Sequence, residues 1–183
     1  HMDIFGYETM THQCFDHGVV GDGEEVFTDL CVSISKKEVI NSKPGLLFRQ
    51  NGKVCGTGVA EVKNLDTIPI PAIDLIDISK YYNTVGKKQM VATICTSRGC
   101  PFHCTFCQVP PRHYRMRSVK NIVDEIKLYL KQGVTDFFFF DDLFNITKKR
   151  VIEFSEEILR NNLNIGWMFR GRADQIDDVM LKS

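Results

Sequence analysis

The sequence predicts an α/β protein with a parallel sheet, and two observations support this fold class. Short apolar runs at residues 90–95, 137–140 and 165–169 have the length of strands. Each run is followed by apolar residues at helical spacing, so a strand-then-helix unit occurs three times between residues 88 and 183. Strands that alternate with helices form parallel sheets with right-handed crossovers. Three units cannot close a barrel by themselves, so we expect the chain to be a piece of a longer protein.

The first part of the chain is predicted to contain a strand, a helix and a hairpin. Residues 18–20 are a short apolar run that ends a strand, and the glycines at 21–23 allow a tight turn after it. Acidic residues then suit a helix start, and the helix is predicted to run to about residue 35. Residues 45–56 are predicted to form a hairpin, with Asn51-Gly52 as its type I′ turn.

Residues 65–87 separate these elements from the repeated units. They contain two prolines and a mixture of polar and apolar residues, which predicts a linker that runs extended over a surface. We therefore expect residues 1–64 and residues 88–183 to be separate structural parts.

The three helices that follow the strands have identifiable ends. Ser118 stands at an N-cap position, and Gly133 is placed to end that helix. Thr147 or Asn145 starts the second helix, and Asp174 is expected to cap the third. The wholly apolar run at residues 137–140 predicts a strand buried on both faces. The paired acidic residues on the helices are predicted to be solvent-exposed; they are Asp124, Glu125, Glu156 and Glu157.

Composition excludes several classes of protein. The formal net charge is +0, which gives no reason to expect nucleic acid or a membrane surface as a partner. The apolar runs are far shorter than a membrane span. An odd count of seven cysteines argues against a disulfide framework and favours the reducing cytoplasm. Four scattered cysteines are predicted to be small apolar residues in or near the core; they are Cys14, Cys31, Cys55 and Cys95.

The remaining three cysteines are the candidate metal ligands. Cys100, Cys104 and Cys107 follow the first apolar run at C-x3-C-x2-C spacing. Three thiolates from one loop can hold three corners of a four-iron cluster and leave the fourth iron open to a small molecule. Zinc is the alternative, but it usually takes four ligands, and no second cysteine pair follows. The sequence therefore favours an open iron–sulfur site.

This triplet, with Phe106 before its last cysteine, resembles the signature of the radical S-adenosylmethionine superfamily. The resemblance implies a [4Fe–4S] cluster that chelates S-adenosylmethionine and cleaves it to methionine and a 5′-deoxyadenosyl radical. It also implies a TIM-type barrel, of which residues 88–183 are the N-terminal, truncated part. An external electron donor of the flavodoxin or ferredoxin type is implied as a partner.

The resemblance also suggests cofactor-binding residues. Phe106 is expected beside the adenine, and Asp141 or Asp142, after the second strand, is expected to meet the amino group of S-adenosylmethionine. From its position alone, Arg170-Gly171-Arg172 follows the third strand, and a guanidinium there either meets a carboxylate of cofactor or substrate or is solvated at the surface. The basic stretch at residues 110–117 either binds an anionic substrate or crosses the barrel rim.

The upstream segment resembles the cobalamin-type branch of the superfamily. Residues 19–25 are similar to the Gly-Glu-Gly-Glu turn near the end of a cobalamin-binding domain, and residues 65–71 to the linker that follows it. The resemblance implies that residues 1–64 are the C-terminal part of a Rossmann-like domain. No cobalt-ligand motif is present, so cobalamin is expected only in the full-length parent. That branch methylates or rearranges small molecules, lipids or pigments.

Two alternatives belong to other classes. The residues around Cys107 and the arginines after it are also similar to methylthiotransferases that modify tRNA or a ribosomal protein. The second alternative is that the chain, as a truncated half-barrel, is an inactive structural or zinc-binding fragment. Strands beyond residue 183 are expected to line the substrate pocket.

Overall fold

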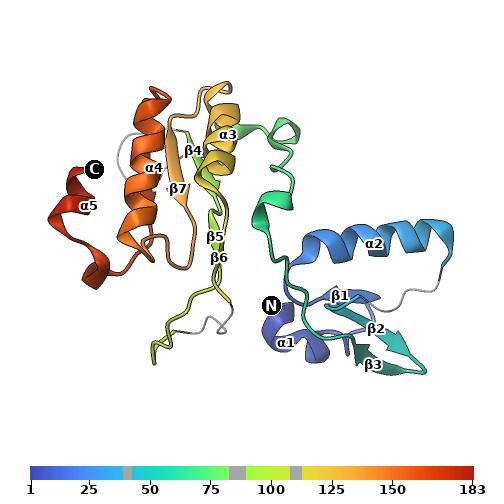
Figure 1. Ribbon diagram of the computed structural model, residues 1–183. Coiled ribbons are helices and arrows are strands. Elements are labelled where there is room, and N and C mark those ends of the chain that lie inside the picture. The colour runs from blue at the N-terminus through green and yellow to red at the C-terminus, as the bar shows by residue number, and fades with distance from the viewer. Residues whose placement is uncertain (39–42, 83–89, 108–112) are drawn as a thin grey trace. The chain divides into compact units, whose positions relative to one another are not determined.

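The computed structural model describes residues 1–38, 43–82, 90–107 and 113–183. The chain divides into two compact units, His1–Lys63 and Asn64–Ser183 (Figure 1). Each unit has its own cluster of buried apolar side chains. Among the helices in the described ranges, none is both long enough and apolar enough to cross a membrane.

The first unit contains the predicted strand, helix and hairpin. After α1 (Met2–Thr9), which the sequence did not predict, come β1 (His17–Val19) and α2 (Gly23–Lys36). The hairpin consists of β2 (Leu46–Gln50) and β3 (Lys53–Gly56). The three strands form one sheet in the order β1-β2-β3, and both pairings are antiparallel. A Rossmann-like sheet is parallel, so the assignment of this unit to such a domain stays a prediction.

The turn of the hairpin has the predicted geometry. Asn51 and Gly52 have φ angles of 51° and 74°, and a type I′ turn requires positive φ at both positions. Asparagine and glycine tolerate this conformation better than other residues, which confirms the turn.

The segment after the first unit is not extended as predicted. Its described part forms three short 3₁₀ helices, Leu65–Thr67, Ile73–Leu75 and Ile78–Lys80, and it belongs to the second unit. The reason lies in its apolar residues, since Ile73 is buried in the core of that unit. Residues 83–87 lie outside the described residues.

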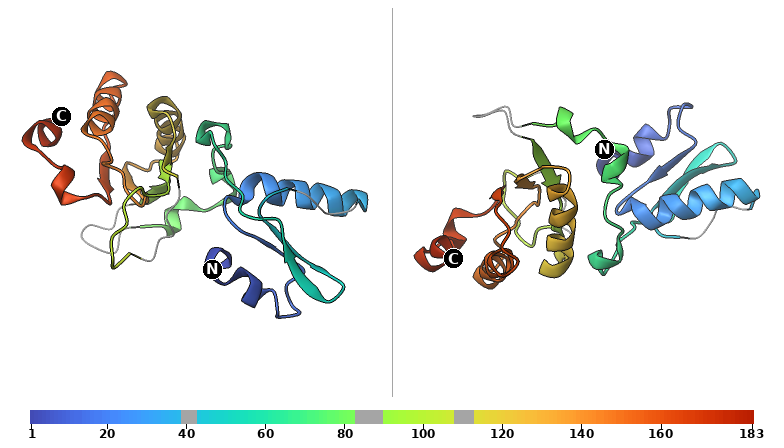
Figure 2. Two further views of the ribbon diagram at one scale, coloured as in Figure 1. Left: turned by 60° about the horizontal axis from the view of Figure 1, so that its bottom comes forward. Right: turned by 90° about the horizontal axis from the view of Figure 1, so that it is seen from above.

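The second unit is built on a three-stranded parallel sheet. Its strands are β4 (Val91–Ile94), β7 (Asp136–Phe139) and β8 (Gly166–Phe169), in that order. The helices α3 (Val119–Leu130) and α4 (Lys148–Arg160) lie side by side and contact each other (Figure 2). The predicted alternation of parallel strands and helices is confirmed.

The phenylalanine run is buried on one face of the sheet only. Phe137 and Phe139 are completely buried with the core side chains of α3 and α4. Phe138 is half-buried and Phe140 is 46% exposed. The prediction of a strand buried on both faces was therefore wrong, because α3 and α4 pack on the same face.

Two of the three predicted helix caps are confirmed. The hydroxyl of Ser118 accepts a hydrogen bond from the amide of Asn121 at 3.2 Å, and Thr147 caps α4 in the same way. The last helix, α5 (Asp178–Lys182), is capped by Asp177 rather than by the predicted Asp174. The side chain of Asp174 is instead bound by an arginine two residues before it.

Candidate functional site

The segment that carries the three cysteines has a fixed base. It leaves the sheet after β4 through β5 (Ser97–Arg98) and returns through β6 (Arg115–Met116). These two-residue strands pair antiparallel, and the amide of Arg117 donates to the carbonyl of Thr96 at 2.9 Å. The two ends of the segment are therefore held together by backbone hydrogen bonds, a feature that the sequence did not predict.

The structure places the cysteines on this segment without gathering them around one point. Cys100 and Cys104 are half-buried, Cys107 is exposed, and all three are unpaired thiols. In the described part of the chain, no three histidine, cysteine or acidic side chains are grouped to hold a metal ion. Phe106 is 87% exposed. The ligand set and the role of Phe106 therefore stay predictions.

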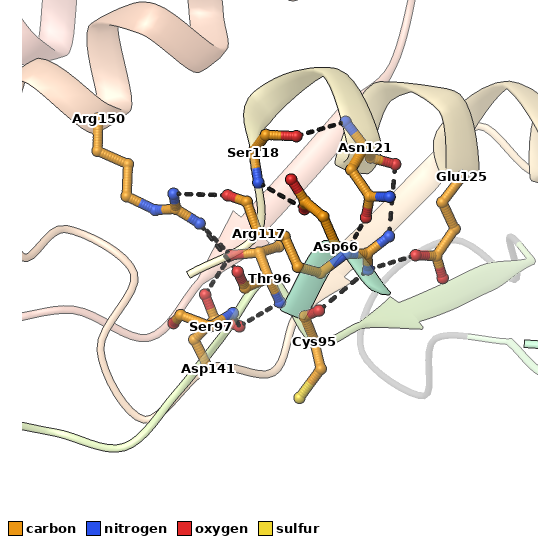
Figure 3. Close-up of polar contacts among 10 residues, drawn as sticks. All are labelled: Asp66, Cys95, Thr96, Ser97, Arg117, Ser118, Asn121, Glu125, Asp141 and Arg150. Atoms are coloured by element: carbon orange, nitrogen blue, oxygen red, sulfur yellow. Dashed lines mark hydrogen bonds and ion pairs between the residues drawn. The ribbon is translucent and has the colours of Figure 1, made fainter. Parts of the chain in front are cut away.

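Asp141 holds the start of the cysteine segment. Its carboxylate is buried and accepts hydrogen bonds from the amides of Thr96, at 2.6 Å, and Ser97, at 3.1 Å (Figure 3). It also accepts a hydrogen bond from the Thr96 hydroxyl. Both carboxylate oxygens are engaged within the chain, which argues against direct contact of Asp141 with a cofactor. The carboxylate instead ties the end of β7 to the end of β4.

Arg150 reaches the same point from α4. Its Nη2 donates to the carbonyl oxygen of Thr96 at 3.1 Å and to the Thr96 hydroxyl at 2.9 Å (Figure 3). Its Nη1 donates to the carbonyl of Arg117 at 3.3 Å. A buried guanidinium therefore binds both the outgoing and the returning ends of the cysteine segment. Its charge balances the nearby buried carboxylate of Asp141, with the Thr96 hydroxyl between them.

A buried ion pair lies beside these hydrogen bonds. Arg117 pairs with Glu125 of α3, which is 1% exposed, and donates to the carbonyl of Cys95 at 3.1 Å (Figure 3). Its Nε donates to the side chain of Asn121 at 2.6 Å. The prediction that Glu125 is solvent-exposed was therefore wrong. Its carboxylate neutralises the charge of Arg117 at the base of the cysteine segment.

The two other predicted cofactor residues are exposed. Asp142 is exposed at the carboxyl end of β7. The guanidinium of Arg170 stacks on the ring of Phe140, with its carbon 4.0 Å from the ring centre, and lies 5.5 Å from that of Phe138. Both side chains therefore lie at the carboxyl edge of the parallel sheet, as the strand order predicted.

Arg172 contacts the cysteine segment directly. Its Nη1 donates to the sulfur of Cys104 at 3.6 Å, and its guanidinium stacks 4.3 Å from the ring centre of Phe102. The buried side chain of Asn145 binds the main chain of Arg172 through both its amide nitrogen and its oxygen. The sequence did not predict this contact with Cys104.

The basic stretch is described only in part. Residues 110–112 lie outside the described residues, so their predicted role is not tested. Tyr114 on the returning arm donates to the carbonyl of Leu143, in the segment after β7, at 3.4 Å. Burial raises the pKa of the Tyr114 phenol, so the hydroxyl remains a donor at neutral pH.

Residues 94–181 match the family model described as the Radical SAM superfamily. The match begins at the last residue of β4 and includes the cysteine segment, both helices that support it and the three parallel strands' carboxyl ends. Residues 94–181 therefore resemble this superfamily in sequence.

Known proteins resemble the chain over most of its length. It is 33% identical to an uncharacterised methyltransferase of Pyrococcus horikoshii, covering 93% of this chain and 38% of that protein. It is 32% identical to the anaerobic magnesium-protoporphyrin IX monomethyl ester cyclase of Rubrivivax gelatinosus, covering 86% and 30%. The chain thus spans well under half the length of these curated relatives.

A solved structure confirms the α/β fold class. The radical S-adenosylmethionine methyltransferase TsrM of Kitasatospora setae, solved with cobalamin and a [4Fe–4S] cluster, matches with a TM-score of 0.63 at 20% identity. The match covers 89% of this chain and 34% of that one.

Proposed function

We propose that the protein carrying this chain is a radical S-adenosylmethionine enzyme whose [4Fe–4S] cluster is held by Cys100, Cys104 and Cys107. The observation that carries the proposal is the C-x3-C-x2-C triplet, which lies inside the superfamily match and follows the first strand of a parallel sheet. When bound, such a cluster supplies the electron that cleaves S-adenosylmethionine to methionine and a 5′-deoxyadenosyl radical.

The donor set fits this group. Three thiols from one segment supply the sulfur ligands that iron–sulfur clusters require, and none of them is used in a disulfide. Two of the thiols are half-buried, which favours partial exclusion of water. The guanidinium donor at Cys104 supplies a positive group beside a site that carries negative charge.

The residues around the triplet have distinct proposed roles. Asp141 positions the cysteine segment, because its carboxylate holds the amides of Thr96 and Ser97. Asp142 is the candidate for the amino group of S-adenosylmethionine, since it is exposed at the same edge of the sheet. Arg170 and Phe106 are proposed to meet the carboxylate and the adenine of that cofactor.

The proposed role of the whole protein is methylation or rearrangement of a small-molecule or lipid substrate. The methyltransferase and cyclase relatives support it, as does the cofactor content of the structural neighbour. On this proposal, residues 1–64 end a cobalamin-type domain, residues 88–183 begin a TIM-type barrel, and cobalamin serves the full-length protein. An external flavodoxin or ferredoxin supplies electrons.

The test is anaerobic reconstitution with iron and sulfide. We expect a brown protein with about four irons per chain. Changing any one of Cys100, Cys104 and Cys107 to alanine should abolish release of 5′-deoxyadenosine from S-adenosylmethionine in the full-length protein. Cys31→Ala is the matched control, because Cys31 lies on α2 in the other unit, and it should keep the cluster.

Two results would contradict the proposal. One is a colourless protein that binds a single zinc ion. The other is full cleavage of S-adenosylmethionine by any of the three alanine variants.

A further inference from the structure

Arg172 connects the segment after β8 to the cysteine segment. Its Nη1 lies 3.6 Å from the sulfur of Cys104, a residue 68 positions earlier in the sequence. Side-chain donors at a cysteine sulfur matter in iron–sulfur proteins because hydrogen bonds to the sulfurs help to set the reduction potential.

The backbone of Arg172 is held in place by a buried amide. Asn145 is completely buried, accepts a hydrogen bond from the amide of Arg172 and donates to its carbonyl, both at 2.9 Å. The preceding Gly171 packs against this amide, since a Cβ atom there would collide with the oxygen of Asn145 and lie 2.8 Å from the ring of Phe169. The backbone of Arg172 is therefore held at its amide and at its carbonyl, and the residue before it is closely packed.

The guanidinium itself is also oriented. Asp174 accepts hydrogen bonds from Nε at 2.9 Å and from Nη2 at 2.6 Å, which leaves Nη1 directed at Cys104. The ring of Phe102, on the cysteine segment, stacks against the plane of the guanidinium. An arginine guanidinium is not deprotonated in proteins, so Arg172 carries a positive charge.

We propose that Arg172 is a positioning residue that orients Cys104 and raises the reduction potential of the cluster, and this rests on the proposed function. Reduction adds one negative charge to the cluster. A cationic donor at a ligand sulfur stabilises the reduced state more than the oxidised state, so it makes reduction easier. Asn145, Gly171 and Asp174 hold the donor at the required place.

The experiment is a redox titration of the reconstituted full-length protein without S-adenosylmethionine, followed by electron paramagnetic resonance. At an applied potential equal to the midpoint potential of the unaltered protein, the ratio of reduced to oxidised cluster should be at least tenfold lower in Arg172→Gln. This corresponds to a midpoint potential lowered by about 59 mV for one electron. The matched control is Arg170→Gln. It removes the same charge from the same segment, but Arg170 stacks on phenylalanines instead of contacting a cysteine. Its shift should be less than half as large.

Each outcome has a defined meaning. An unaltered protein without a four-iron cluster contradicts the proposed function and removes the basis of the inference. A loaded Arg172→Gln protein with an unchanged midpoint, or an equal shift in Arg170→Gln, overturns the inference alone. If Arg172→Gln does not hold the cluster, Arg172→Met, which also removes the positive charge, is titrated in its place. A lowered midpoint in that variant supports the inference, and an unchanged midpoint overturns it.

Discussion

Two neighbouring aspartates in this chain have opposite environments. Asp141 is buried and accepts three hydrogen bonds at the start of the cysteine segment, whereas Asp142 is exposed. A buried carboxylate whose two oxygens both accept hydrogen bonds within the chain has a structural role, and an exposed one is open to a ligand. The contrast separates the two residues that the sequence alone left equivalent.

Substitution of Asp141 and of Asp142 should have different effects on stability. Asp141→Asn replaces an acceptor with an amide that presents N–H groups to other donors, so the free energy of unfolding should fall by about 3 kcal/mol. Asp142→Asn should change it by less than about 0.5 kcal/mol. Urea unfolding monitored by circular dichroism measures both.

The exposed Asp142 should matter for ligand binding, although it should matter little for stability. Asp142→Asn should weaken binding of S-adenosylmethionine to the reconstituted protein while its iron content stays unchanged. Equal stability losses in the two variants, or unchanged binding in Asp142→Asn, would show that these roles are wrongly assigned.

At the scale of elements, α3 contributes a charged residue to its buried side. Glu125 follows Ile122 by three positions and precedes Tyr129 by four, and both of these residues are buried. It therefore shares their helix face. Its partner Arg117 precedes the helix and bonds to the carbonyl after β4. The ion pair thus fixes α3 to the base of the cysteine segment.

Removal of this carboxylate should be costly. Glu125→Ala leaves the largely buried Arg117 without compensation, and the expected loss of unfolding free energy is about 3–5 kcal/mol. The control is Asp124→Ala on the same helix, which removes an exposed pair with Lys120 and should cost about 0.3–0.5 kcal/mol. Chemical denaturation of both variants decides the matter, and similar losses would refute the structural role of Glu125.

The regular elements of the second unit were predictable because their signals are local. Apolar spacing located α3 and α4, and Ser118 and Thr147 were recognisable as caps. The position of Glu125 was also encoded in the helix phase, between buried residues of the same face. Its charged neighbour Asp124 obscured this signal, since paired acidic residues usually face solvent.

Other features depend on contacts between distant residues. The two-residue strands β5 and β6 are too short to show a period, and their pairing became visible only in the fold. Asn145 reads as an ordinary polar residue after a strand until its bonds to the main chain of Arg172 are known. The role of Asp141 likewise depends on a partner 45 positions away.

At the scale of the whole molecule, the described residues form two separate apolar cores. One lies between α2 and the antiparallel sheet of the first unit, and includes Val26 and Leu46. The other lies between the parallel sheet and its helices, and includes Phe139 and Phe154. Each unit therefore has its own source of hydrophobic stabilisation.

Core truncations should therefore act on one unit at a time. Leu46→Ala should destabilise residues 1–63 by about 2–5 kcal/mol, and Phe139→Ala should destabilise residues 64–183 by about 3–5 kcal/mol. Hydrogen exchange followed by mass spectrometry reports protection in each unit separately. Loss of protection across both units in either variant would contradict the separation of the two cores.

The closed base of the cysteine segment has a consequence for the order of assembly. The pairing of β5 with β6, and the bonds from Asp141 and Arg150, use only groups of the chain itself. The chain alone therefore closes the segment, at the entropy cost of loop closure, without any group from outside the chain. The proposed cluster therefore takes its three thiolates from one segment whose ends are already tied together, instead of from three independent ligands.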